Sequence, residues 1–359
     1  MKARPTKMKL RNMPEQTAKR LALVLGAVLL VLILVIALFP LLDSVGKPYE
    51  VTTYAMGSYV QQSVYGDNSE EAAVAAADAI QALENEISWR VSGSDVQKLN
   101  NAAGKDWVEL NSDTMEILEI AQDVAERSGG AFDVTIAPVS RLWDFDSERQ
   151  EVPDIDTIDA LLPNVGYEFL RLDTEENTAS LKNLDNAVDL GGVGKGAACD
   201  AAIEAYAETG VEAAIVSVGG SVGVWGQKDS GADWSIAVRD PNSDGALGAL
   251  SIESGFLATS GSYEKCFTQD GKTYHHLLDP ETGYPAETGL VSVTVLCDNG
   301  ARADALATAC FVLGLEEGQA LLESYNAEGI FISTDNVITV TDGLQDRFTL
   351  TADGYTIAE

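Results

Sequence analysis

One segment divides this chain into two parts with different physical requirements. Residues 21–39 (LALVLGAVLLVLILVIALF) contain no charged side chain. A helix of about 20 apolar residues is long enough to cross a bilayer. The segment is longer than the apolar core of a usual signal peptide, and no A-x-A cleavage site precedes Asp43. We therefore expect residues 21–42 to form a transmembrane anchor or an uncleaved signal, with cleavage as the alternative.

The charges on either side of this segment differ in sign. Residues 1–20 are rich in Lys and Arg and hold one acidic residue, Glu15, whereas the whole chain has a net charge of −33. Because basic flanks stay on the cytoplasmic side, we expect a basic cytoplasmic tail over residues 1–20 and a single-pass protein of the cell membrane. The part from about residue 43 onward would be extracytoplasmic. Its acidic excess repels polyanions, which excludes a nucleic-acid partner.

The remainder of the chain alternates strand-like and helix-like patterns. We expect a linker over residues 43–52 and a single domain over residues 53–359. The predicted strands and hairpins lie at 51–66, 186–190, 213–226, 234–241, 290–298 and 329–344. The predicted helices lie at 70–87, 113–128, 197–210 and 301–314, and extended or loop structure is predicted at 131–145. This order predicts an α/β fold of the α+β kind, in which mixed, largely antiparallel sheets are flanked by helices.

A glycine-rich stretch reads as strand, loop and helix. In VDLGGVGKGAACD (188–200), backbone N–H groups at the start of a helix would form an anion site that glycines allow a phosphate to approach. The stretch has neither a Walker A motif nor a GxGxxG fingerprint, so glycine content alone equally fits a tight structural turn. Lys195 favours phosphate binding, because it places a cation in this loop of a strongly acidic domain.

The predicted helix at 301–314 carries a pair of oxygen ligands. Asp304 and Thr308 are four residues apart and therefore lie on one face of the helix. A carboxylate, a hydroxyl and a nearby carbonyl would form an all-oxygen site of the kind that Mg²⁺ prefers. Alternatively, Asp304 would cap the N-terminus of the helix and Thr308 would be an ordinary surface residue.

The chain has only two histidines, His275 and His276, in YHHLLDPETGYP (274–285). Histidine is the side chain that exchanges protons near neutral pH, so the pair indicates either an active-site loop or packing at a strand end. Ser260 lies on a small-residue turn and fits a nucleophile or a phosphate contact, although the absence of a GxSxG motif disfavours a serine hydrolase. Trp89 and the segment 143–145 would either stack on an aromatic ligand or belong to the core.

Taken in order, seven segments resemble the FAD:protein FMN transferase (ApbE) family over most of residues 51–345. They are AMGSYV (55–60), FDVTIAPVSRLWDF (132–145), VDLGGVGKGAACD (188–200), VSVGG (216–220), ATSGSYEK (258–265), YHHLLDPETGYP (274–285) and SVTVLCDNGARADALATACFVLG (292–314). The resemblance implies a fold related to the T-fold and a Mg²⁺-dependent enzyme with FAD as its substrate. Such an enzyme cleaves the FAD pyrophosphate, attaches FMN through a phosphoester to a Ser or Thr of a target protein and releases AMP. The implied partners are exported or membrane-bound redox proteins.

The resemblance also implies roles for individual residues. By position in the matching segments, the metal ligands would be Asp304, Thr308 and the main-chain carbonyl of Gly192. The residues expected to contact FAD are Met56, Trp143, Asp144, Phe145, Asp189, Lys195, Ser260 and the backbone near Leu278. His276 matches the functional histidine of the family, and we hypothesise that it is the catalytic base, together with Asp304 as the second catalytic residue. Asp279 would either orient His276 or hold a turn, and His275 would have a packing role.

Three positions depart from the family pattern. Ala197 occupies a position where the family usually has an aromatic residue. Gly194 occupies a position where alanine is commoner. The family's S-x-Y sequence after the first helix is Ser88-Trp89-Arg90 in this chain. These departures concern FAD affinity more than the type of reaction. A sequence at 244–250 loosely resembles the Asp-Gly…Ala-Thr motif of flavinylated targets, but Leu250 has no hydroxyl to modify.

Two other functions are compatible with the same residues. One is a Mg²⁺-dependent FAD pyrophosphatase, in which water replaces the acceptor hydroxyl. The other is a non-catalytic FAD-binding protein, against which His276, Asp304 and Thr308 argue, because a pure binder needs no base.

Overall fold

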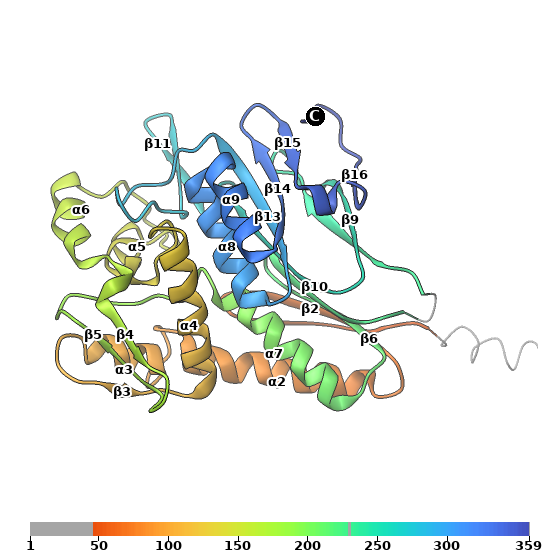
Figure 1. Ribbon diagram of the computed structural model, residues 1–359, viewed down its shortest axis with the longest axis horizontal. Helices are drawn as coiled ribbons and strands as arrows, with labels where there is room; N and C mark the ends of the chain where they lie inside the picture. Colours follow the sequence, from red (N-terminus) through yellow and green to blue (C-terminus); the bar gives the residue numbers. More distant parts are fainter. Residues whose placement is uncertain (1–45, 229–230, 359) are drawn as a thin grey trace, which may run out of the picture. The chain divides into compact units, whose positions relative to one another are not determined.

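A largely antiparallel sheet forms the scaffold of the structure, a computed structural model that describes residues 46–228 and 231–358 (Figure 1). The predicted anchor and basic tail lie outside the described residues. Among the described residues, no helix is long and apolar enough to cross a membrane. Residues Pro48–Glu359 form one compact unit, and its first strand begins at Tyr49, earlier than the predicted boundary at residue 53.

The main sheet of the described chain has nine strands in the order β1-β2-β6-β7-β10-β13-β14-β15-β17. Every neighbouring pair is antiparallel except β15 and β17, which are parallel. The strands are β1 (Tyr49–Ala55), β2 (Ser58–Tyr65), β6 (Ala213–Val218), β7 (Ser221–Gly226), β10 (Gly255–Gly261), β13 (Leu290–Cys297), β14 (Glu328–Ser333), β15 (Val337–Val340) and β17 (Thr356–Ile357).

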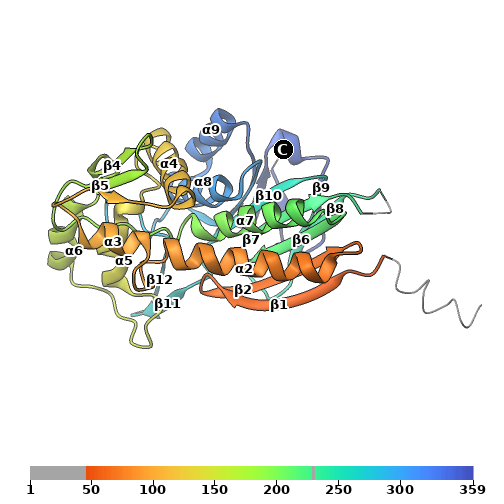
Figure 2. The same ribbon diagram turned by 90° about the horizontal axis from the view of Figure 1, so that it is seen from below.

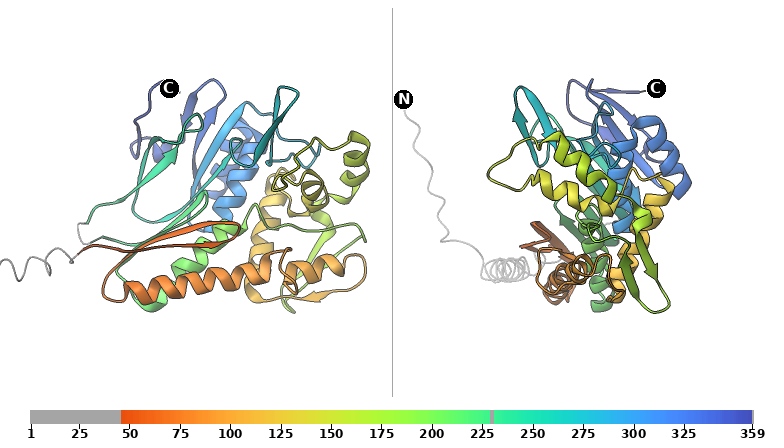
Figure 3. Two further views of the ribbon diagram at one scale, coloured as in Figure 1. Left: turned by 180° about the vertical axis from the view of Figure 1, so that it is seen from behind. Right: turned by 90° about the vertical axis from the view of Figure 1, so that its left-hand side faces the viewer.

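Helices cover one face of this sheet. The helices are α2 (Ser69–Ile87), α3 (Asp95–Asn101), α4 (Ser112–Arg127), α5 (Ala137–Trp143), α6 (Ile155–Leu161), α7 (Gly194–Thr209), α8 (Gly300–Leu313) and α9 (Leu315–Tyr325). Helix α2 runs alongside the β1–β2 hairpin, while α7 packs on β6 and β7 and α8 packs on β10 and β13 (Figures 2 and 3). Side chains alternate between the two faces of a strand, so Phe256 and Ala258 of β10 belong to the helix-side core, and Leu257 belongs to the core on the other face.

Smaller elements complete the fold. The second core lies between the main sheet and a three-stranded sheet of β16 (Phe348–Leu350), β9 (Ala246–Ile252) and β8 (Trp234–Arg239). A separate small sheet contains β3 (Val108–Glu109), β5 (Thr178–Leu181) and β4 (Leu170–Asp173), and the hairpin of β11 (Cys266–Gln269) and β12 (Lys272–His275) stands by itself. Short 3₁₀ turns occur at η2 (Val134–Ile136), η3 (Leu162–Asn164), η4 (Tyr167–Phe169) and η5 (Asp342–Leu344).

Most of the predicted elements are confirmed, and two are wrong. Residues 186–190 are not a strand, because the side chain of Asn100 bonds both backbone groups of Val188, at 2.7 and 3.0 Å, in place of a neighbouring strand. Residues 131–145, predicted as extended or loop, contain η2 and α5. The Asp133 side chain accepts the Thr135 N–H at the start of η2, and Pro138 lies in the first turn of α5, where proline is tolerated.

The crossing of α7 and α8 depends on glycine. A Cβ built on Gly196 would lie 1.9 Å from the carbonyl oxygen of Gly300. We therefore expect Gly196→Ala to force the two helices apart and to lower the free energy of unfolding by about 1–3 kcal/mol or more. Denaturant unfolding measures this loss. In the control Gly245→Ala, the new Cβ would meet only the Ser243 hydroxyl, at 3.3 Å, and stability should stay near that of the parent. Equal stability of the two variants would contradict the close helix contact.

Candidate active site

Several predicted site residues meet where the N-terminus of α7 contacts α8. Asp304 is buried on α8, and its Oδ2 atom accepts the backbone N–H of Gly196 at 3.0 Å. The ammonium group of Lys195 lies 3.6 Å from the same oxygen. The glycine-rich stretch and the aspartate of the oxygen pair, more than 100 residues apart in the sequence, therefore form one site.

A second group of oxygens lies one turn further along α8. The Thr308 hydroxyl lies 3.1 Å from the hydroxyl of Ser260. Ser260 was predicted on a turn, but it lies within strand β10, where it pairs with Val293 of β13. Gly192 is close to Thr308, because a Cβ built on it would lie 3.9 Å from Thr308 Oγ1. In the described chain, no three His, Cys, Asp or Glu side chains are grouped to hold a metal. A metal held by Asp304, Thr308 and Gly192 would therefore be bound by carboxylate, hydroxyl and carbonyl oxygens, a donor set that fits Mg²⁺.

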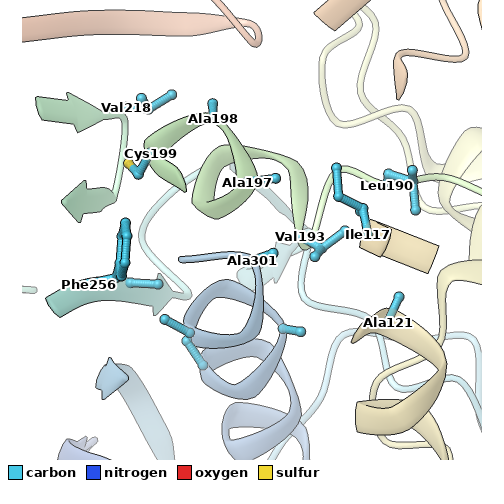
Figure 4. Close-up of a cluster of buried hydrophobic side chains, with 14 of the residues drawn as sticks. Ile117, Ala121, Leu190, Val193, Ala197, Ala198, Cys199, Val218, Phe256 and Ala301 are labelled. Atoms are coloured by element: carbon cyan, nitrogen blue, oxygen red, sulfur yellow. The ribbon is translucent and has the colours of Figure 1, made fainter. Parts of the chain in front are cut away.

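The first turn of α7 is anchored in the helix-side core. Val193, Ala197, Ala198 and Cys199 are buried in this cluster, together with residues of α4, β6, β10 and α8 (Figure 4). Ala197, which replaces the family's usual aromatic, is thus a core position with 4% of its surface exposed. Lys195 belongs to this packed turn, and its ammonium group lies beside Asp304.

The turn of the β1–β2 hairpin covers the glycine-rich loop. Met56 occupies this turn with a φ of 56°, and a Cβ built on Gly194 would lie 3.0 Å from its terminal methyl carbon. Gly194, where the family more often has alanine, therefore leaves the space that Met56 fills. The Lys195 ammonium also donates to the carbonyl of Gly191 at 3.4 Å, so the loop holds the cation in place.

His276 directly follows β12 and faces a cationic environment. Burial, followed by the nearby charges of Lys195, Lys265 and His275, lowers its pKa from 6.5 to about 3. Its Nδ1 atom is buried without a hydrogen-bond partner among the described residues. The imidazole is therefore neutral at physiological pH and has a nitrogen free to accept a proton.

The other residues of the histidine loop have structural positions. His275 is buried and packs edge-on against Phe311, with ring centroids 5.4 Å apart, which fits the packing role expected for it. Asp279 accepts the backbone N–H of Glu281 at 2.9 Å and the hydroxyl of Thr282 at 3.2 Å. Of the two roles considered for Asp279, these bonds favour the turn.

The segment 143–145 belongs largely to an aromatic cluster. Trp143 is 2% exposed, donates its indole N–H to the carbonyl of Gly283 at 2.9 Å and stacks on Phe145 at 5.4 Å. Leu278 is buried in the same cluster. Asp144, which lies between Trp143 and Phe145 in the sequence, is exposed and has a φ of 42°. Of this segment, Asp144 and the main chain are the groups most available to a ligand.

A group of cations that sequence reasoning left unassigned lies beside Asp189. The Asp189 carboxylate accepts the indole N–H of Trp89 at 3.0 Å. The guanidinium groups of Arg90 and Arg141 lie 4.4 and 4.3 Å from the centroid of the Trp89 ring. Trp89, Arg90 and Arg141 line a hollow of about 400 Å³. The other residues that line it are Gln97, Asn100 and Asn101.

Asp146 links this group to the histidine loop. Its carboxylate pairs with Arg90 at 3.1 Å and with Lys265 at 2.8 Å. Burial alone would raise the pKa of Asp146, but the Lys265 hydrogen bond and the surrounding cations outweigh burial and lower it. Arg141 and Lys265 lie in two of the segments that resemble the family, and Arg90 lies at a departure from its pattern, but no motif in the sequence indicates that these three basic side chains come together.

Comparison with known proteins places this chain in a family. The ApbE family matches residues 56–331. The FAD:protein FMN transferase of Treponema pallidum (strain Nichols) is 32% identical over 284 residues, which cover 75% of this chain and 78% of the relative. The enzyme of the same name from Klebsiella pneumoniae (strain 342) is 29% identical over 316 residues, which cover 87% of this chain and 98% of the relative.

Solved structures have the same fold. The ApbE protein from Thermotoga maritima superimposes with a TM-score of 0.77 and 31% identity, over 83% of this chain and 98% of its own. The flavinyl transferase ApbE of Pseudomonas stutzeri gives a TM-score of 0.75 with 28% identity, over 85% of this chain and 98% of its own. The match to the family model, the relatives at about 30% identity and the shared α/β fold agree, and the chain belongs to the ApbE family.

Proposed function

We propose that this protein transfers FMN from FAD to a Ser or Thr hydroxyl of a target protein, forming a phosphoester and releasing AMP. The observation that carries this proposal is the grouping of Asp304, Thr308 and Lys195 at the N-terminus of α7, within a chain of the ApbE family. An oxygen-lined metal site beside a cation and a helix N-terminus suits a pyrophosphate substrate.

Charge neutralisation is the first requirement of the reaction. Mg²⁺ held by Asp304, Thr308 and the Gly192 carbonyl would supply Lewis-acid stabilisation of charge on the phosphates. Lys195 would bind the pyrophosphate beside the metal, since its ammonium lies 3.6 Å from Asp304. Both contributions act in a partly buried site, where electrostatic stabilisation is stronger than in water.

His276 meets the second requirement, a base for the acceptor hydroxyl. The neutral imidazole accepts the hydroxyl proton while the hydroxyl oxygen forms a bond to the FMN phosphorus. The anhydride bond of the pyrophosphate breaks in the same step, and AMP leaves with the bridging oxygen. The cations Lys195 and Lys265 help to lower the pKa of His276 in the free protein. A bound pyrophosphate would offset their charge and raise that pKa toward the working range of a base.

The pH dependence of kcat/KM for FAD tests this assignment. A base acts in its neutral form, and a pKa lowered from 6.5 to about 3 keeps His276 neutral in the free enzyme through mildly acidic pH. We therefore expect kcat/KM, which reports free-enzyme ionisations, to stay level as the pH falls from 7 through 6.5 and to decline only well below that value. A decline centred at or above pH 6.5 would contradict the burial of this histidine.

We also propose that residues 21–42 anchor the protein in the cell membrane with residues from about 43 onward outside the cytoplasm. The apolar run and its basic flank support this arrangement. The targets would then be exported or membrane-bound redox proteins with an acceptor Thr or Ser. Protease treatment of intact cells should degrade the catalytic domain, and resistance that disappears only after lysis would reject this topology.

A mass measurement tests the proposed activity. The full chain in detergent is incubated with FAD, Mg²⁺ and a peptide bearing the acceptor motif, and the peptide is expected to gain the mass of FMN attached by a phosphoester. Release of AMP and free FMN with unlabelled peptide would indicate a pyrophosphatase. Binding of FAD without turnover would indicate a non-catalytic binder.

A further inference from the structure

Two exposed tyrosines lie side by side on the β1–β2 hairpin. Tyr54 and Tyr59 are a cross-strand pair, and 66% and 69% of their surfaces are exposed. Their ring centroids are 5.8 Å apart in an edge-to-face arrangement. Large apolar side chains exposed as a pair need an explanation, because tyrosine is enriched where proteins bind one another.

The tyrosines belong to a face of the hairpin with little charge. Helix α2 covers the opposite face, on which Val60, Gln62 and Val64 are buried. The exposed residues of the outer face are Glu50, Thr52, Tyr54, Tyr59 and Gln61, of which only Glu50 is charged. In a chain of net charge −33, this low charge is unusual, and depletion of charge is typical of the core of an interface.

The hairpin also presents an open sheet edge. Strand β1 is the first strand of the main sheet, and among the described residues it pairs only with β2 (Figures 2 and 3). The outward N–H and C=O groups of an edge strand can pair with an added strand. Addition of an extended peptide to such an edge is a recurring mode of recognition, in which alternate side chains give specificity.

This edge leads directly to the candidate active site. The turn between the two tyrosines contains Met56, which contacts the position of Gly194 at the start of α7. Ser58 and Lys195 both lie close to Gly219, because a Cβ built on Gly219 would lie 2.9 Å from Ser58 Oγ and 3.3 Å from Lys195 Cδ. The tyrosine pair is therefore at the end of the hairpin that touches the phosphate-binding loop.

We propose that the outer face of the β1–β2 hairpin docks the acceptor segment of the target protein. The segment would add to the β1 edge as an extended strand, with an uncharged side chain against Tyr54, whose ring packs on Tyr59, and would carry its Ser or Thr hydroxyl past the turn toward His276. The inference rests on the proposed FMN transfer and names the surface that selects the acceptor. Lipid is the less favoured occupant, because the tyrosines lie at the opposite end of β1 from Tyr49, where the chain enters the strand.

The double variant Tyr54→Ser/Tyr59→Ser of the full chain tests the docking surface. The acceptor is a peptide with the acceptor motif flanked by uncharged residues. We expect its KM to rise about tenfold or more, as for loss of an aromatic anchor, while KM for FAD and kcat at saturating peptide stay unchanged. Both rings are exposed, so loss of their mutual contact should lower the free energy of unfolding by only about 1 kcal/mol and leave the variant folded. The variant Tyr54→Phe/Tyr59→Phe keeps the rings and should keep most of the affinity.

A matched control and a lipid assay separate the outcomes. Leu184→Ser removes a side chain that is 67% exposed and should leave the peptide KM unchanged. An unchanged peptide KM in the double serine variant would overturn the docking proposal, and so would a defect confined to binding of phosphatidylcholine vesicles. If the parent protein transfers no FMN to any peptide, the proposed function itself fails. That result differs from a rise in peptide KM that is seen only in the double serine variant.

Discussion

Asp304→Asn is expected to lower kcat/KM for FMN transfer by about 10²–10³-fold or more. The carboxylate is buried, contacts the Lys195 ammonium at 3.6 Å and accepts the Gly196 N–H at 3.0 Å. An amide removes the negative charge that a Mg²⁺ ion needs and leaves Lys195 without its counter-charge. The rate of AMP formation from FAD measures the loss, and calorimetric titration with Mg²⁺ measures the metal affinity independently of activity.

The matched control for this substitution is Asp298→Asn. Asp298 precedes the same helix, its side chain is 86% exposed, and it pairs with Arg302 at 3.1 Å. Exposed ion pairs contribute little to stability, about 0–1 kcal/mol, so this variant should transfer FMN at nearly the parental rate. An Asp304→Asn protein that remains folded and as active as Asp298→Asn would remove Asp304 from the site.

His276→Gln is expected to reduce kcat by about 10²–10⁴-fold, the usual contribution of a general base. FAD affinity should change little, because the proposed base acts on the acceptor hydroxyl. Single-turnover measurements with saturating FAD and peptide isolate this step from binding. The neighbouring variant His275→Gln gives the opposite pattern. His275 packs on Phe311, so its loss should lower the unfolding midpoint and leave turnover largely intact.

The two histidine variants together separate catalysis from packing. If His276→Gln transfers FMN normally while His275→Gln does not, the roles assigned to the two residues are reversed. If both lose activity with equal loss of stability, the loop has a structural role only. We expect the kinetic defect in the His276 variant and the stability defect in the His275 variant.

Much of the fold was predictable because the residue patterns of its helices and strands match the faces that these elements bury in the structure. The Ala-rich helix α2, the glycine-rich hairpin β6–β7 and the helix α8 all lie where residue periodicity predicts them. Residues 186–190 were mispredicted because strand formation depends on a neighbouring strand, and there the side chain of Asn100 satisfies Val188 instead. No local pattern in the sequence reveals a bond between residues this far apart.

The site was predictable where a residue's role follows from its neighbours in the sequence. Asp304 and Thr308 share a helix face by spacing alone, whereas their proximity to Lys195 and Ser260 requires the tertiary fold. Arg90 and Arg141 were recognised as a pair of cations beside the site only from the structure, in which both lie against the Trp89 ring. The resemblance to a family gave the positions of the matching residues, but not which of them are buried, as Trp143 is.

The stoichiometry of the products tests the central claim most directly. The full chain is incubated with FAD, Mg²⁺ and acceptor peptide, and AMP and FMN-labelled peptide are quantified from the same sample. Group transfer predicts one labelled peptide for each AMP, with the phosphoester on the acceptor Thr or Ser. AMP formed together with free FMN, at a rate independent of the peptide, would contradict transfer and identify the protein as a hydrolase of FAD.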